Sequence, residues 1–225
     1  MTQIVFLPGF DGVASLRREF TDALAKKHEV RAVSYPNRRM GSLDAYRDHA
    51  MAAAPVDWKP ALVAESFSGL VAARWAATDS RVSALVLCCS FARNPVGHAA
   101  SLGAAIPSLV KIGPAFMGPL TWATGDARRA KWGAGLSRAM GELDDDVVAE
   151  RLRLIAGEDV SAALRALTIP VVLVHFKGDL VIDASARSQL EAACNSPRIL
   201  KLEGPHFAIA TRPAECAEAI GASLA

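Results

Sequence analysis

Six short apolar segments, separated by helix-like segments, constrain the fold of this chain more than any other feature. Most of the six are continuous runs of Val, Ile, Leu and Ala, whereas half-buried strands alternate apolar and polar residues. Continuous apolar strands are typical of a parallel sheet that is covered on both faces. The six segments are Gln3–Leu7, Glu29–Val33, Ala61–Glu65, Ser83–Cys89, Pro170–Phe176 and Arg198–Leu202.

The segments between these strands favour helices. Ser42 can cap one of them, and Pro213 suits the first turn of another. Alternating strands and helices predict an α/β fold, a doubly wound and mostly parallel sheet of about six strands with helices on both faces. The expected helices are Ser15–His28, Ser42–Ala53, Phe67–Ala77, Ala184–Cys194 and Pro213–Leu224.

One long segment, residues 90–169, breaks the alternation because it holds no good strand. Its first part contains several Pro and Gly pairs, and its second part favours helices at Asp126–Met140 and Asp144–Ala156. A structureless loop of this length is unusual inside a compact domain. We therefore predict an inserted helical lid at residues 91–166, on a core domain formed by residues 1–90 and 167–225.

Ser66 stands where the third strand turns into a helix. The local sequence is Ala64-Glu65-Ser66-Phe67-Ser68-Gly69, with small residues two positions before and two positions after the serine. A sharp strand–turn–helix needs small residues there, because strand and helix approach closely. The pattern is less specific than G-x-S-x-G. The alternative is an ordinary turn in which Ser66 caps the helix.

Three further loops follow the carboxyl ends of predicted strands. Leu7-Pro8-Gly9-Phe10-Asp11-Gly12 follows the first strand and can expose backbone N–H groups. Asp179 and His206 follow the last two strands. In a parallel sheet these strand ends share one edge, where ligands bind, so we expect Ser66, Asp179 and His206 to meet there.

Other polar residues near these loops are weaker candidates for the chemistry. Asp183 competes with Asp179 as the acid, but better suits the start of the next helix. We expect His175 to be structural. We also expect the side chain of Glu65 to point away from Ser66, supporting the turn through a charge or a hydrogen bond.

With these four motifs the chain resembles the α/β-hydrolase superfamily, in its serine-esterase branch. The motifs are LPGFDG at 7–12, AESFSG at 64–69, GD at 178–179 and GPHF at 204–207. The resemblance implies a Ser66 nucleophile, a His206 general base and an Asp179 that orients the histidine. It also implies an oxyanion hole formed by the backbone N–H groups of Phe10 and Phe67. Two departures are Ser68 in place of the second glycine of the turn, and Pro8 in place of a common histidine.

These residues predict a serine hydrolase that cleaves a carboxylic ester of a small or acyl-chain substrate through an acyl-enzyme at Ser66. A thioesterase acting on acyl-CoA or an acyl carrier is one alternative. A non-catalytic, hydrolase-like binding protein is another, although it would not need the complete set of three residues. The first part of the lid is apolar and predicts an acyl pocket, with packing onto the body as the alternative. The pocket candidates are Leu102, Ile106, Phe116, Met117 and Trp122.

The charged residues point to no polyanionic partner. The formal net charge is only +2, and no block of Lys and Arg suggests nucleic-acid binding. Charged residues of both signs do occur together in the lid, where a solvated surface is the expected role. Docking of an acyl carrier is the alternative. The charged residues are Arg128, Arg129, Lys131, Arg138, Glu142 and Asp144–Asp146.

The absence of metal-binding and nucleotide-binding motifs favours an enzyme without a metal or a cofactor. The sequence has no H-E-x-x-H, no P-loop and no Cys/His spacing typical of a metal site. Its four cysteines form no C-x-x-C pair, and we expect free thiols. We see no signal peptide and no uncharged apolar run long enough for a membrane span. The sequence thus predicts a cytoplasmic protein.

Overall fold

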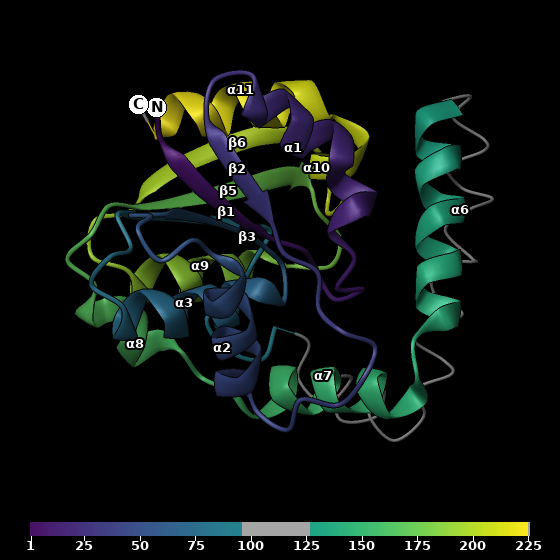
Figure 1. The fold of residues 1–225 in the computed structure, drawn as a ribbon, viewed down its shortest axis with the longest axis horizontal. Helices are drawn as coiled ribbons and strands as arrows, with labels where there is room; N and C mark the ends of the chain where they lie inside the picture. Colours follow the sequence, from purple (N-terminus) through teal and green to yellow (C-terminus); the bar gives the residue numbers. More distant parts are fainter. Residues whose placement is uncertain (96–126, 225) are drawn as a thin grey trace.

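The centre of the fold is a six-stranded sheet in the order β2-β1-β3-β4-β5-β6, and all five strand pairs are parallel (Figure 1). The computed structural model describes residues 1–95 and 127–224, apart from the side chains of 127–129. The predicted parallel sheet is confirmed. The strands are β1 (Gln3–Leu7), β2 (Glu29–Ala32), β3 (Ala61–Glu65), β4 (Ala84–Cys88), β5 (Val171–Gly178) and β6 (Arg198–Pro205).

The continuous apolar pattern of the central strands supplies two hydrophobic cores. In β3, Leu62 and Ala64 belong to one core, whereas Val63 belongs to the core on the opposite face. In β4, Val86 lies opposite Val63 and faces the same second core. Successive side chains of a strand point to opposite faces, so a strand covered on both sides needs apolar residues at every position.

Helices cover both faces of the sheet (Figure 1). One face carries α1 (Arg18–Ala25), α10 (Ala208–Thr211) and α11 (Pro213–Ser223), with the 3-10 turn η1 (Ala14–Arg17) leading into α1. The other face carries α2 (Leu43–Ala53), α3 (Ser68–Thr78), α8 (Ser161–Ala166) and α9 (Ala184–Ala193). Two more helices, α6 (Ala127–Glu142) and α7 (Asp145–Gly157), lie beside this layered body (Figure 1).

Most predicted helix ends agree with the structure. Ser42 caps α2 by accepting a hydrogen bond from the N–H of Ala45 at 3.2 Å, and Pro213 lies in the first turn of α11. The segment predicted as one helix at Ser15–His28 differs, because it begins as η1 and its α-helix ends at Ala25. The short helices α8 and α10 were not predicted.

Two strands extend past their apolar runs, and this extension places the site. Strand β5 continues to Gly178 and β6 to Pro205, and these two residues pair after a register irregularity that follows Phe176. The residues that follow, Asp179 and His206, therefore leave the sheet from neighbouring positions.

The second part of the predicted lid forms the expected helices, observed as α6 and α7. Helix α8, also inside the predicted lid, packs against α3 and α9 of the body. The five pocket candidates Leu102, Ile106, Phe116, Met117 and Trp122 lie outside the described residues. None of the helices in residues 1–95 and 127–224 has the length and apolar character needed to cross a bilayer.

Candidate active site

Ser66 sits at the tip of a strained turn between β3 and α3. Its φ angle is +53°, in the left-handed region that a non-glycine residue adopts at a cost. Its N–H donates to the carbonyl of Cys88 in β4 at 2.9 Å. Helix α3 begins only at Ser68 and has no side-chain cap. The alternative in which Ser66 caps the helix is therefore wrong.

Gly69 allows α3 to approach the end of β4. A Cβ atom at this position would lie 1.8 Å from the hydroxyl oxygen of Ser90. That hydroxyl donates to the carbonyl of Ser66 at 2.8 Å. The close approach that makes a small residue necessary therefore falls at position 69, and Ser68 is accommodated.

The structure brings Ser66, His206 and Asp179 together in one hydrogen-bonded chain. His206 Nε2 lies 3.1 Å from Ser66 Oγ, and His206 Nδ1 lies 2.9 Å from Asp179 Oδ2. The other carboxylate oxygen, Oδ1, accepts from the N–H groups of Val181 and Ile182 at 2.8 and 2.9 Å. His206 and Asp179 are buried.

These contacts fix the proton pattern of the histidine. Burial raises the pKa of Asp179, but the hydrogen bonds from His206, Ile182 and Val181 outweigh burial, so the pKa lies below its ordinary value. An ionised Asp179 accepts the proton on Nδ1 of His206. Nε2 is then unprotonated and can accept the proton of the Ser66 hydroxyl.

The competing residues have other partners. Asp183 caps α9, because its Oδ1 accepts from the N–H of Ala186 at 2.8 Å. His175 lies in β5 with its Nε2 3.0 Å from a carboxylate oxygen of Glu191, an arrangement that fits the expected structural role.

The two backbone N–H groups expected to form an oxyanion hole remain available. Phe67 follows Ser66 directly, and Phe10 lies in the loop after β1. Within the described part of the chain, neither the Phe10 N–H nor the Phe67 N–H donates a hydrogen bond. Their rings contact edge to face, with centroids 6.5 Å apart.

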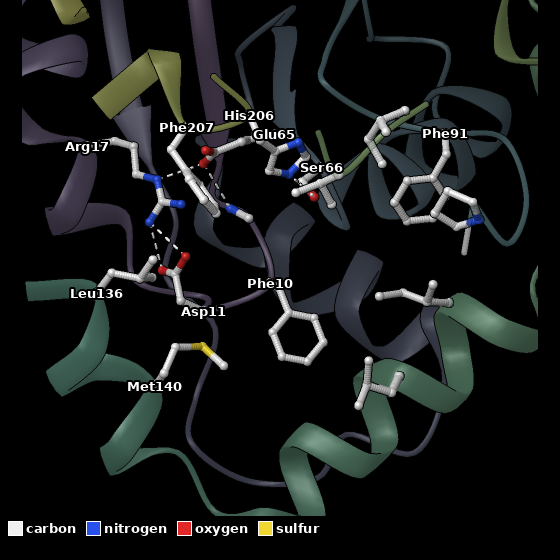
Figure 2. A pocket seen from close by; sticks show the side chains of 16 residues that line it. Phe10, Asp11, Arg17, Glu65, Ser66, Phe91, Leu136, Met140, His206 and Phe207 are labelled. Atoms are coloured by element: carbon white, nitrogen blue, oxygen red, sulfur yellow. Dashed lines mark hydrogen bonds and ion pairs between the residues drawn. The ribbon is translucent and has the colours of Figure 1, made fainter. Parts of the chain in front are cut away.

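A buried charge cluster lies beside Ser66, and sequence reasoning missed most of it. Glu65 lines the cavity that Ser66 also lines, and its carboxylate points toward Arg17 and away from Ser66, as expected (Figure 2). Glu65 Oε2 accepts from Arg17 Nε at 2.7 Å, and Arg17 Nη1 pairs with Asp11 at 2.8 Å. One signal could have revealed Arg17, because it precedes the buried Phe20 and Leu24 by three and seven residues, on the same helical face.

A largely apolar cavity of about 240 Å³ opens next to the site. Figure 2 shows Ser66 and His206 on one side of it, the Arg17 cluster on another, and Leu136 and Met140 of α6 forming part of the wall. Helix α7 adds two more apolar residues to the wall. The apolar lining includes Phe10, Phe91, Leu136, Met140, Leu152, Ile155, Val181, Ile182 and Phe207.

One group of residues in the described chain has the atoms for a metal site. Ligand atoms of Cys89, Asp179 and His206 lie within 4.8 Å of one another. Two of the three residues are already bonded to each other, and burial raises the pKa of the Cys89 thiol well above its ordinary value. A protonated thiol is a poor ligand, so we propose no metal here.

Comparison with known proteins places this site in a familiar fold. A family model described as "Alpha/beta hydrolase family" matches residues 4–219. Comparison with curated protein sequences yields no match.

Three solved structures illustrate the likeness in fold. The enol-lactonase from Burkholderia xenovorans LB400 superimposes with a TM-score of 0.80 at 16% identity, covering 99% of this chain and 91% of that one. A hydrolase from Pseudomonas aeruginosa PA01 gives 0.82 at 16% identity, covering 99% and 89%. A thermophilic esterase from Thermogutta terrifontis gives 0.77 at 15% identity, covering 100% and 89%. At these identities the likeness shows the fold alone.

Proposed function

The chain belongs to the alpha/beta hydrolase family, and we propose that it is a serine hydrolase that cleaves carboxylic esters through an acyl-enzyme at Ser66. The observation that carries the proposal is the chain of contacts from Ser66 Oγ through His206 to Asp179, at 3.1 and 2.9 Å. A serine at a strained turn, a histidine within reach and a carboxylate on its far nitrogen are the groups that acyl transfer requires.

In the first half of the reaction, Ser66 Oγ attacks the carbonyl carbon of the ester while its proton passes to His206 Nε2. Asp179 stabilises the resulting imidazolium. The negative oxygen of the tetrahedral intermediate accepts from the N–H groups of Phe10 and Phe67. Collapse of the intermediate expels the alcohol, which takes the proton from Nε2 and leaves an acyl group on Ser66.

In the second half, water attacks the acyl-enzyme and gives a proton to His206 Nε2. The same two N–H groups hold the oxygen of the second intermediate. Its collapse releases the carboxylic acid, and the proton on Nε2 returns to Ser66 Oγ. The site is thereby regenerated.

The cavity suggests the kind of acyl group that the site accepts. Apart from Ser66 and His206, its wall is apolar except for the cluster of Asp11, Arg17 and Glu65, whose formal charges sum to −1. Both ion pairs of Arg17 are internal, so no unpaired cation among the described lining residues awaits a carboxylate. A neutral, compact acyl chain therefore fits better than an anionic one. Helices α6 and α7 supply part of this wall, which supports a lid role for the segment 91–166.

Labelling by a fluorophosphonate probe tests the nucleophile. The wild-type protein should be labelled, and Ser66→Ala should lose both labelling and at least about 10⁴-fold of ester turnover while folding normally. Ser185→Ala is a matched control, because Ser185 is an exposed serine on α9. Wild-type turnover in Ser66→Ala would contradict the proposal, and a folded wild type that resists labelling would favour the non-catalytic alternative.

A substrate panel tests the bond that is cleaved. Comparing kcat/KM for p-nitrophenyl esters of increasing acyl length with that for acyl-CoA esters separates esterase from thioesterase. We expect the oxygen esters of short acyl groups to be the better substrates. Turnover of thioesters alone would leave Ser66 as the nucleophile and replace ester cleavage by the thioesterase alternative.

A further inference from the structure

The loop that carries the Phe10 N–H, residues Pro8–Gly12, is held at three successive peptide groups; we name it the oxyanion loop. The first held group is the peptide between Pro8 and Gly9. The hydroxyl of Ser68 donates to the Pro8 carbonyl, and the Gly9 N–H donates to Glu65 Oε2 at 3.1 Å. Both partners come from the turn that carries Ser66.

The second held group is the peptide between Gly9 and Phe10. Its carbonyl accepts from the N–H of Gly12 at 3.0 Å. The C=O and N–H of a trans peptide point in opposite directions, so this bond turns the Phe10 N–H away from Gly12. The orientation of the candidate oxyanion donor is therefore set by a bond on the other side of its own peptide.

The third held group is the Phe10 carbonyl, which accepts from Arg151 Nη1 of α7 at 2.5 Å. Arg151 is fully buried, and its guanidinium lies over the rings of Tyr35 and Tyr46, 5.7 Å from each centroid. It also packs against Gly12, where a Cβ atom would lie 2.9 Å from both terminal nitrogens. Helix α7, which is remote in sequence, therefore also holds the oxyanion loop in place.

The two side chains that hold the Pro8–Gly9 peptide, Glu65 and Ser68, are themselves held by other residues. Glu65 is also bound by Arg17. The Ser68 oxygen lies 2.7 Å from the Tyr35 hydroxyl. Burial raises the pKa of Tyr35 above its ordinary value, so the phenol keeps its proton. Because the Pro8 carbonyl can only accept, the Ser68 proton goes to it, and Tyr35 donates to Ser68.

We propose that Glu65, Ser68 and Arg151 are positioning residues that aim the Phe10 N–H at the substrate oxygen. The inference rests on the proposed function, because it concerns the donor of that oxyanion hole. None of the three touches the reacting atoms. An oxyanion donor is effective only if it is oriented before the reaction, and a loop with two glycines would otherwise be free to rotate. Because Glu65 and Ser68 lie on either side of Ser66, they hold the nucleophile and the Phe10 N–H in a fixed relative position.

Three variants remove the contacts one at a time, namely Ser68→Ala, Glu65→Leu and Arg151→Met; leucine is chosen at position 65 because a glutamine oxygen could still accept from the Gly9 N–H. Each should lower kcat for a p-nitrophenyl ester by about 10- to 100-fold, less than or equal to the loss of a whole donor, with KM nearly unchanged. Affinity for a trifluoromethyl ketone should fall by the same factor, because its adduct with Ser66 carries the oxyanion. The pH dependence of kcat/KM should keep its wild-type form, since His206 and Asp179 are untouched.

A matched control separates positioning from loosening of α7. Glu150 precedes Arg151 on α7 and accepts from the N–H groups of Met40 and Gly41, at 2.7 and 2.9 Å. It shares the Tyr46 hydroxyl with Arg151, but none of its hydrogen bonds goes to the oxyanion loop. Glu150→Gln should therefore keep wild-type kcat and ketone affinity. An equal loss in Glu150→Gln and Arg151→Met would assign the effect to loosening and overturn the role of Arg151.

Ser68→Ala keeps the test decisive if a buried-charge variant fails to fold, because it removes only one hydroxyl. Unchanged kcat and ketone affinity in folded Ser68→Ala and Glu65→Leu would overturn the proposal. A lowered melting temperature without a kinetic change would show that these side chains stabilise the fold only. Failure of the proposed function would look different, because the wild type itself would lack turnover and fluorophosphonate labelling.

Discussion

Replacing Asp179 by asparagine should reverse the proton pattern of His206. Asp179 Oδ1 accepts two backbone N–H groups, from Val181 and Ile182, while Oδ2 accepts from His206 Nδ1. In Asp179→Asn the amide oxygen should stay on the backbone side, because an NH₂ group there would face two donors. The NH₂ group then faces Nδ1, which must become an acceptor, so the imidazole proton moves to Nε2.

The expected loss of kcat in Asp179→Asn follows from this tautomer. A protonated Nε2, 3.1 Å from Ser66 Oγ, cannot accept the serine proton. The same substitution in a serine protease triad lowers kcat by about 10⁴-fold with the geometry intact, which is about 5.5 kcal/mol of transition-state stabilisation. Asp179 does not line the described cavity, so KM should change little.

The assay is steady-state hydrolysis of p-nitrophenyl acetate, with thermal unfolding measured alongside. Asp183→Asn is the matched control, because Asp183 caps α9 and asparagine caps a helix equally well. The control should keep both activity and melting temperature. Activity of Asp179→Asn within tenfold of the wild type would refute the reasoning, as would a greater loss in Asp183→Asn.

Three further predictions test the pocket and the fold. Met140→Trp should narrow the cavity and lower the ratio of kcat/KM for an octanoyl ester to kcat/KM for an acetyl ester. Each methylene that no longer fits should cost about 1–3 kcal/mol of transition-state binding. An unchanged ratio would show that Met140 does not line the acyl pocket. Hydrogen bonds from Arg81 lower the pKa of Asp79 to about 2. Asp79→Asn should therefore lower the free energy of unfolding by about 1–2 kcal/mol at pH 7, and this difference from the wild type should shrink as the pH falls from about 4 to 2. Urea unfolding at several pH values measures the difference, and a difference that does not change with pH would contradict the prediction. Gly69→Ala should lower stability by about 1–3 kcal/mol in thermal unfolding, because its Cβ would lie 1.8 Å from Ser90 Oγ, and an unchanged melting temperature would show that the contact relaxes freely.

The sequence by itself determined the fold class and the three residues of the proposed triad. Continuous apolar strands such as Ala61–Glu65 require cover on both faces, and their alternation with helices indicates a parallel sheet between two helical layers. A parallel sheet aligns the carboxyl ends of its strands, so loops remote in sequence converge at one edge. Ser66, Asp179 and His206 could be found because each follows such a strand end.

The tertiary structure alone decided which charged residues support the site. Sequence patterns assign a charged side chain to the surface, and they fail where a partner from a distant segment compensates its burial. Arg17 is buried because Asp11 and Glu65 pair with it, and Arg151 because it meets the Phe10 carbonyl. The spacing of Arg17, Phe20 and Leu24 indicates that Arg17 faces inward, but no local spacing identifies Glu65 or the Phe10 carbonyl as partners. Those contacts depend on how the loop after β1, the end of β3 and α7 pack together.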